Sequence, residues 1–155
     1  MAKEIMERRA SDNVYLHRDF HGALSTGIEY LHRTLGEDAV REYLTRFTRS
    51  YYAPVTRDIR ERGIPAIRDY FERIYAIEES DVTFEQTEDS LTVHVATCPA
   101  VTHMRAHGYP VARLFIETTR TVNEALVEGT PFDAELSEYN DETGRSIQRF
   151  TRRRP

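Results

Sequence analysis

The pattern of the chain changes within the stretch His94-Val95-Ala96-Thr97-Cys98-Pro99-Ala100-Val101-Thr102-His103-Met104-Arg105-Ala106-His107-Gly108-Tyr109-Pro110. Apolar and polar residues alternate up to this stretch, as in a half-buried strand, and the spacing then becomes helical. A residue before proline avoids the α conformation, whereas proline itself suits the first turn of a helix. The stretch therefore predicts a strand, then Cys98 as the N-cap of a short helix that ends at Gly108.

Most of the chain before this stretch has helical spacing. Two helices are predicted, with inward faces formed by Leu16, Phe20, Leu24, Ile28, Leu31 and Leu35, and by Val40, Leu44, Phe47, Tyr51, Val55 and Ile59. Gly36 separates them, and Pro54 predicts a break near residues 52–53. A third helix is predicted from Pro65, with Ile67, Tyr70, Phe71, Ile74 and Tyr75 inward. Residues 1–13 have weak periodicity and are expected to fray.

Strand patterns dominate the rest of the chain. Residues 82–86 and 91–96 alternate as a hairpin, and residues 132–139 and 145–152 as a second hairpin around Gly144, with a long helix predicted between them over 111–127. This segregated order predicts one α+β domain over residues 1–155. Its helical N-terminal half would pack on a small antiparallel sheet together with the further long helix, and residues 152–155 would form a basic tail.

Composition restricts the classes of function. The 155 residues carry a net charge of −5, which argues against nucleic acid as a partner. No window approaches the roughly 18 apolar residues of a membrane span, and the N-terminus is too charged for a signal peptide. A single cysteine cannot form an internal disulfide, which fits a reducing cytoplasm. We therefore expect a cytoplasmic protein without nucleic-acid or membrane partners.

Cys98 is the first candidate for chemistry. Free N–H groups and the dipole at a helix N-terminus favour a thiolate, the reactive form of cysteine. His103 is five residues further, roughly 140° around the helix axis, and His94 is about 13 Å back along a strand. Neither histidine is therefore placed locally as a partner base, and a partner has to come from tertiary contact. An inert, buried cysteine is the alternative.

His103 and His107 are four residues apart and share a helix face, as the two histidines of some metal sites do. The glutamate that follows the first histidine in a zincin is replaced here by Met104. The chain also has no phosphate-binding glycine loop, dinucleotide fingerprint or Gly-x-Ser-x-Gly elbow. We therefore predict neither a metal nor a cofactor.

Two acids could serve in general acid–base catalysis if they point into a pocket. Glu117 lies on the edge of the apolar face of the long helix, and Glu135 lies in a strand. A buried carboxyl would have a raised pKa suited to this role, whereas a surface salt bridge or a solvent-facing strand position is the alternative. Arg113 could hold a substrate carboxylate, and Tyr139-Asn140 could form a polar binding pair.

The second half of the chain resembles the L-2-amino-thiazoline-4-carboxylic acid hydrolase family, loosely and over roughly residues 20–152. The resemblance lies in the strand that ends in Cys98-Pro99, the short helix before Gly108-Tyr109-Pro110, the acid within Leu114-Phe115-Ile116-Glu117, and the final strand pair around Gly144 with Phe150. The helical leader from Leu35-Gly36-Glu37-Asp38-Ala39 is also similar. More distantly, the last hairpin resembles small-molecule-binding domains of the 4-vinyl-reductase type.

The resemblance implies a cytoplasmic enzyme that opens a small sulfur- and nitrogen-containing ring by hydrolysing a C–N bond. It matches Cys98 to the cysteine of the family's Cys-Pro pair and Glu117 to the acid on the following helix. Members often carry further cysteines on the long helix and in the last strand, where this chain has Phe115-Ile116 and Ser146-Ile147-Gln148. A mechanism that needs several thiols is therefore not expected.

Two hypotheses of function remain, and both involve a small molecule. The leading one is a hydrolase of a C–N bond in a small polar, ring-containing substrate. Cys98 and Glu117 would carry its chemistry with His94 or His103 as helper, and Arg113, Glu135, Tyr139 and Asn140 would bind the substrate. The alternative is a non-catalytic small-molecule-binding or sensory domain with an unreactive Cys98. A homodimer that buries an amphipathic helical face is a further expectation.

Overall fold

The computed structural model describes residues 18–154, so the expectation that residues 1–13 fray lies outside the described part. The helices are α1 (Asp19–Leu35), α2 (Glu37–Tyr51), α3 (Ala53–Arg62), α4 (Ile64–Ile77), α5 (Pro99–Ala106) and α6 (Glu117–Leu126). The strands are β1 (Val82–Gln86), β2 (Ser90–Val95), β3 (Phe132–Tyr139) and β4 (Ser146–Arg152). The predicted α+β fold is confirmed.

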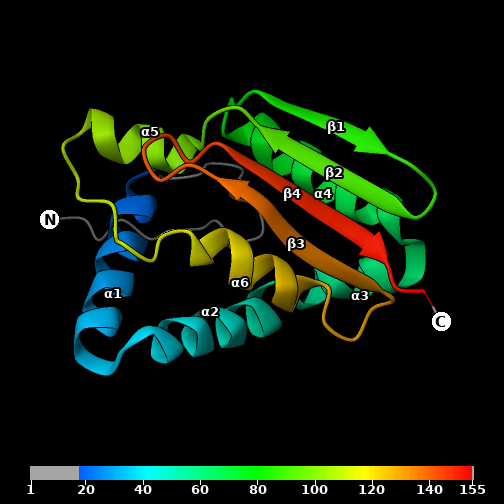
Figure 1. Cartoon of the computed structure of the whole chain (residues 1–155), viewed down its shortest axis with the longest axis horizontal. Coiled ribbons are helices and arrows are strands. Elements are labelled where there is room, and N and C mark those ends of the chain that lie inside the picture. The colour runs from blue at the N-terminus through cyan, green and yellow to red at the C-terminus, as the bar shows by residue number, and fades with distance from the viewer. Residues whose placement is uncertain (1–17, 155) are drawn as a thin grey trace, which may run out of the picture.

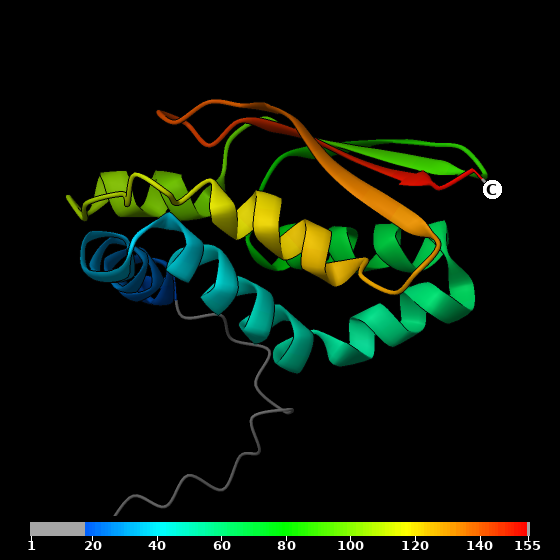
Figure 2. The same cartoon turned by 60° about the horizontal axis from the view of Figure 1, so that its bottom comes forward.

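The four strands form one antiparallel sheet in the order β1-β2-β4-β3. The two predicted hairpins are therefore joined through β2 and β4, whose register pairs Leu91 with Phe150 and Val93 with Gln148. The helices lie on one side of this sheet, with α4, α5 and α6 nearer to it than α1 and α2 (Figure 1, Figure 2). The opposite face of the sheet is left uncovered within the described residues.

The uncovered face is polar because strand residues alternate between the two faces. Arginines of β4 lie opposite acids of β3: Arg149 is in register with Glu135. Arg145 lies 3.2 Å from the Glu138 carboxylate, and Arg153, just after β4, lies 2.9 Å from Asp133. Cross-strand charge pairs suit a solvated face. The predicted basic tail thus begins inside the sheet, since Arg152 ends β4.

Two apolar clusters fill the space under the covered face. The first joins α3, α4 and the end of α6 to the sheet, and includes Ile59, Ile67, Phe71, Leu91, Val93, Leu126, Phe132 and Phe150. The second joins α1, α2 and α5 to the segment before α6, and includes Ile28, Val40, Leu44, Val101, Met104, Leu114 and Phe115. Tyr75 packs against the first cluster and Cys98 against the second. A residue that contacts both Tyr75 and Cys98 therefore lies at the boundary between the two apolar clusters.

Several local predictions are confirmed. Cys98 has extended dihedrals (φ −76°, ψ 122°) as the N-cap of α5. Pro54 lies in the first turn of α3, directly after α2 ends at Tyr51, so the predicted break is present. Pro65 likewise lies in the first turn of α4.

The predicted long helix over 111–127 is wrong in its first third, because α6 begins only at Glu117. Ser25 of α1 fixes the chain here: its hydroxyl donates to the Pro110 carbonyl (3.0 Å) and accepts from the Ala112 N–H (2.8 Å). Tight i→i+3 hydrogen bonds follow, including Phe115 N–H to the Ala112 carbonyl. This tertiary anchor, which sequence periodicity does not reveal, takes the place of α-helical hydrogen bonds.

Four predicted inward residues are also placed wrongly. Phe20, Leu35, Phe47 and Tyr51 are between 38% and 69% exposed. The buried row of α2 is Val40, Leu44 and Thr48, a strict four-residue spacing that includes a threonine. The Thr48 hydroxyl donates to the Leu44 carbonyl, which satisfies it inside the apolar contact with α6. The aromatic residues of α2 therefore lie one helical row away from the core.

Candidate functional site

Cys98 lies between the start of α5 and the turn that joins β3 to β4. Its N–H donates to the Thr143 carbonyl (3.0 Å). Gly144 has a φ of +66°, and a Cβ added there would collide with the Cβ of Cys98. The turn therefore packs on the cysteine as closely as glycine allows.

The thiol of Cys98 is held in its neutral form. Burial is the largest cause that raises its pKa above the ordinary value, and the negative charge of Glu78 raises it further. The backbone N–H groups of Val101 and Ala100, at the start of α5, act in the opposite direction without reversing the shift. The N-terminus of α5 was expected to lower the thiol pKa, but desolvation raises this pKa by more.

A buried amide connects three elements of the fold. Gln148 of β4 is only 2% exposed. Its oxygen accepts from the Asn123 amide on α6 (2.7 Å), and its nitrogen donates to the Tyr75 hydroxyl on α4 (3.3 Å) and to the Ser146 hydroxyl (3.1 Å). This network ties the sheet to both helices in the otherwise apolar layer.

Two tyrosines, Tyr75 of α4 and Tyr139 of β3, lie near Cys98. Burial raises the pKa of both Tyr75 and Tyr139, and the charge of a Cys98 thiolate would raise each further. Both phenols therefore stay neutral and can donate a hydrogen bond. We call Cys98, Tyr75, Glu78, Asn123, Tyr139, Ser146 and Gln148 the Cys98 cluster.

Glu78 contributes an unusual acceptor to this cluster. It directly follows α4 and is 7% exposed. One carboxylate oxygen lies 3.0 Å from Nε2 of His21 on α1, whereas the other, Oε2, is buried and has no hydrogen-bond partner among residues 18–154. A buried acceptor left unsatisfied costs about 1–3 kcal/mol, more when it is charged. The cluster therefore contains an open hydrogen-bonding position.

Glu117 is buried but is held by other groups. It is 1% exposed at the first position of α6. Its carboxylate accepts from Arg120 (2.9 Å) and Thr121 (2.7 Å) and lies 3.6 Å from the Arg41 guanidinium of α2. Its charge is the main cause that raises the pKa of Arg41. Glu117 thus links α2 to α6, and in the described part it is not among the groups that shift the Cys98 pKa.

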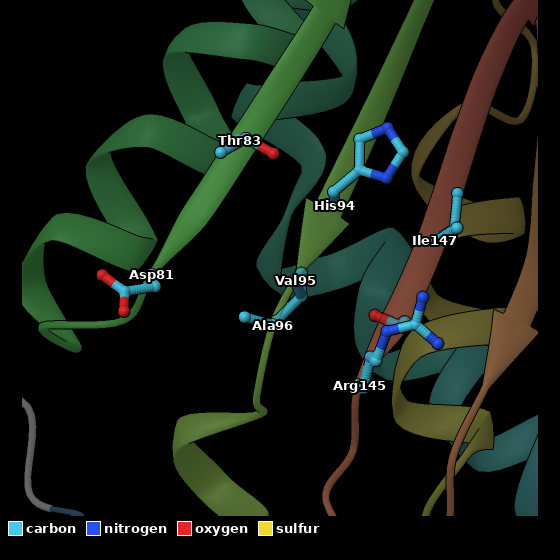
Figure 3. Close-up of a pocket in the computed structure, with 8 residues that line it drawn as sticks. Asp81, Thr83, His94, Val95, Ala96, Arg145 and Ile147 are labelled. Carbon is cyan, nitrogen blue, oxygen red and sulfur yellow. The ribbon is translucent and has the colours of Figure 1, made fainter.

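His94 lies on the uncovered face of the sheet, away from the Cys98 cluster. It lines a cavity of about 240 Å³ together with Asp81, Thr83, Val95, Ala96, Arg145, Ser146 and Ile147 (Figure 3). Nε2 of His94 is 3.3 Å from the Glu85 carboxylate of the neighbouring strand. Ser146 is the one residue that both lines this cavity and belongs to the Cys98 cluster.

His103 reaches α1, and His107 lies beside His103 at the end of the same helix. Nε2 of His103 lies 3.0 Å from the Asp19 carboxylate, and the two imidazole rings are 4.2 Å apart. Nδ1 of His107 bonds the His103 carbonyl. Among residues 18–154 no set of three or more histidine, cysteine or acidic side chains could hold a metal ion.

The predicted substrate-binding residues are dispersed. Arg113 is exposed, with its N–H bonded to the Glu29 carboxylate (3.4 Å), and Glu135 is exposed on the uncovered sheet face. The Asn140 side chain accepts from the N–H groups of Glu142 and Thr143, so it shapes the turn. Tyr139 alone of this set joins Cys98 in the cluster.

The remaining members of the cluster were missed by sequence reasoning. Ser146 and Gln148 have the same strand parity as the buried Phe150, so polar residues at inward positions were a readable signal. Asn123 and Tyr75 lie on helix faces that also carry core residues. Glu78 gave no signal, because an acid after the last turn of a helix is ordinary.

No protein-family model, no curated protein and no solved structure matches the chain. The resemblance to the thiazoline-carboxylate hydrolases therefore stays a prediction. No helix within residues 18–154 is long and apolar enough to cross a membrane.

Replacing Glu117 with Gln tests its structural role. We expect a loss of about 1–2 kcal/mol in unfolding free energy, because the amide weakens the charge-assisted hydrogen bonds of the buried carboxylate, whereas Arg41 and Arg120, 42% and 43% exposed, stay solvated. Urea denaturation measures this loss, with the exposed Glu124→Gln on the same helix as control. A shift of the Cys98 thiol pKa in Glu117→Gln would contradict the separation of Glu117 from the cluster.

Replacing Gly144 with Ala tests the packing of the turn on Cys98. The added methyl group meets Cys98 in a backbone conformation that favours glycine, so we expect a loss of at least about 2 kcal/mol in unfolding free energy. Gly108→Ala is the matched control, because its φ of +70° is similar and a Cβ there meets nothing within 4 Å. Equal losses in the two variants would show that the contact with Cys98 is unimportant.

Proposed function

We propose that this protein is a small-molecule-binding domain that holds its ligand at the Cys98 cluster without changing it chemically. The observation that carries the proposal is Oε2 of Glu78, which is buried and has no hydrogen-bond partner within the described residues 18–154, near a neutral thiol and a hydrogen-bonded polar network. A ligand that donates a hydrogen bond to this oxygen would remove its desolvation cost.

Burying the polar groups of the cluster costs free energy of folding unless each is hydrogen-bonded. They come from α4, α6, β3, β4 and the N-cap of α5, so the fold brings them together from distant parts of the sequence. Apolar side chains of similar volume would fill such a position without hydrogen-bonding requirements. Local departures from simple core packing are typical of functional sites.

The protonation states favour binding over nucleophilic catalysis. A thiol attacks as the thiolate, and here both burial and the charge of Glu78 oppose its formation. The carboxylate expected as acid–base, Glu117, is engaged by two arginines. His103 hydrogen-bonds the Asp19 carboxylate, and Nε2 of His94 lies 3.3 Å from the Glu85 carboxylate on the other face of the sheet.

The chemistry of the cluster suggests the class of ligand. Glu78 offers a negatively charged acceptor, whereas Tyr75 and Tyr139 offer neutral hydroxyl donors. A small polar molecule with an N–H group, such as an amide or amidine, and an acceptor atom beside it would satisfy both. We further propose that the domain works in the cytoplasm, where its single thiol would stay reduced.

Hydrolysis of a C–N bond is the second candidate. It is supported by the position of Cys98, where the N–H groups of Val101 and Ala100 at the start of α5 lower the thiol pKa. Glu78, whose charge shifts the pKa of the thiol, would then take the acid–base role that the sequence suggested for Glu117. The two candidates differ in whether the bound molecule is recovered unchanged.

Titration of the Cys98 thiol distinguishes these candidates. Alkylation by iodoacetamide, followed against pH by mass spectrometry, should give a thiol pKa above the ordinary value of about 8.5. Glu78→Gln should lower this pKa, because it removes a nearby negative charge, whereas Glu79→Gln should leave it unchanged. A wild-type thiol pKa below 8 would favour the hydrolase instead.

Ligand binding tests the site itself. We expect small amides and amidines, screened by two-dimensional NMR, to shift the signals of Tyr75, Cys98 and Gln148 and to be recovered intact. Glu78→Gln should weaken binding at least about tenfold, the effect of losing one charged hydrogen bond, and Glu79→Gln should not. Shifts confined to Thr83, His94 and Ile147 would place binding in the cavity on the open sheet face and overturn the proposed site.

A further inference from the structure

The C-terminal end of α5 carries two histidines whose rings lie side by side. His103 lies in the last turn of the helix and His107 is its C-cap residue, so their four-residue spacing places both on one face. The centroids of the two imidazole rings are 4.2 Å apart. The side chain of His103 is 14% exposed and His107 is exposed, so solvent reaches both. We call these two residues the α5 histidine pair.

A carboxylate from α1 fixes the ring proton of His103. Nε2 of His103 lies 3.0 Å from Oδ1 of Asp19, which is in the first turn of α1. An ionised carboxylate only accepts hydrogen bonds, so Nε2 of a neutral His103 has to carry the proton. Nδ1 of His103 is then the unprotonated nitrogen of this ring, with a lone pair.

A backbone carbonyl fixes the ring proton of His107. Nδ1 of His107 lies 2.9 Å from the carbonyl oxygen of His103. A carbonyl oxygen is also only an acceptor, so Nδ1 of His107 carries the proton and Nε2 of a neutral His107 has the lone pair. Each ring of the pair therefore keeps one unprotonated nitrogen, and the proton of each ring is already committed to a hydrogen bond.

A tyrosine after α5 supports this arrangement. The Tyr109 hydroxyl donates to the same Oδ1 of Asp19 (3.4 Å), and its ring stacks on that of His107 with centroids 5.7 Å apart. A Cβ added at Gly22 of α1 would lie 3.1 Å from the Tyr109 ring, so the tyrosine packs closely on α1. Side chains that are ordered before a ligand arrives lose less conformational entropy when it binds.

We propose that the α5 histidine pair binds a divalent transition metal ion such as Zn²⁺ through Nδ1 of His103 and Nε2 of His107. Imidazole nitrogens are suitable ligands for Zn²⁺, Cu²⁺ and Ni²⁺. In metal sites a ligating histidine almost always donates its other ring N–H to a carboxylate or a backbone carbonyl, which orients the ring. Asp19 and the His103 carbonyl accept these two hydrogen bonds here, and they determine which nitrogen is left for the metal.

The site has two protein ligands, and water fills the other coordination positions. This agrees with the finding that residues 18–154 contain no set of three or more ligating side chains. Structural Zn²⁺ sites use four protein ligands, so we expect weaker binding here, at micromolar metal concentrations. The site does not depend on the ligand proposed for the Cys98 cluster, because Cys98 lies at the opposite end of α5.

Isothermal titration calorimetry of the full chain with Zn²⁺ tests the site. We expect one Zn²⁺ per chain. His103→Gln and His107→Gln should each raise the dissociation constant at least about tenfold, because each removes one of the two protein ligands. His94→Gln, at the histidine of the uncovered sheet face, is the matched control and should leave the constant unchanged. Circular dichroism confirms that each variant is folded.

Asp19→Asn tests the positioning role of the carboxylate. Loss of its charge makes His103 a weaker ligand, and we expect Zn²⁺ affinity to fall about tenfold. Nitrogen-15 NMR of the imidazole rings gives a readout without metal. It should show the proton on Nε2 of His103 and on Nδ1 of His107, and Zn²⁺ should shift the signal of the other nitrogen of each ring.

Three results would overturn the proposal. The first is a wild-type chain that does not bind Zn²⁺ in the calorimeter. The second is a loss of affinity in His94→Gln as large as in His103→Gln. The third is a proton on Nδ1 of His103 or Nε2 of His107 in the metal-free neutral rings, because the proposed ligand atoms would then lack their lone pairs.

Discussion

A buried amide has to be hydrogen-bonded through both its oxygen and its nitrogen, and in this fold Gln148 meets that requirement only if three elements are correctly placed. Its oxygen needs Asn123 of α6, and its nitrogen needs Tyr75 of α4 and Ser146 of its own strand. Apolar contacts tolerate small shifts, whereas hydrogen bonds fix distance and angle. The amide therefore sets the position of α4 and α6 on the sheet more closely than the surrounding apolar clusters do.

The surroundings of Cys98 explain why the pKa of its thiol lies above the ordinary value. Tyr75 of α4 and Tyr139 of β3 lie close enough for a thiolate charge at Cys98 to raise their pKa, and the turn at Gly144 closes against the Cβ of Cys98. Desolvation by burial outweighs the favourable N–H groups at the start of α5. A helix N-terminus lowers a thiol pKa only where the thiolate can be solvated or paired, and here the nearby charge is the negative carboxylate of Glu78.

Sequence periodicity was sufficient for the elements and their class. The alternation around His94, the position of Pro99 after Cys98 and the break at Pro54 are local signals, and the structure confirms each. The unsuccessful predictions depended on distant contacts. Ser25 replaces the first turns of the expected long helix, and the true buried row of α2 includes Thr48, whose hydroxyl is satisfied within its own helix.

The site was predictable only in part for the same reason. Cys98 and Tyr139 carry recognisable signals, whereas Glu78 becomes unusual only because His21 of α1 engages one of its oxygens and leaves the other buried. Glu117 shows the converse: a mid-chain acid beside apolar residues looked free for chemistry, but Arg41 and Arg120 neutralise it. Burial by itself does not make an acid functional. What separates Glu78 from Glu117 is that every oxygen of Glu117 is engaged, whereas one oxygen of Glu78 still lacks a donor among the described residues.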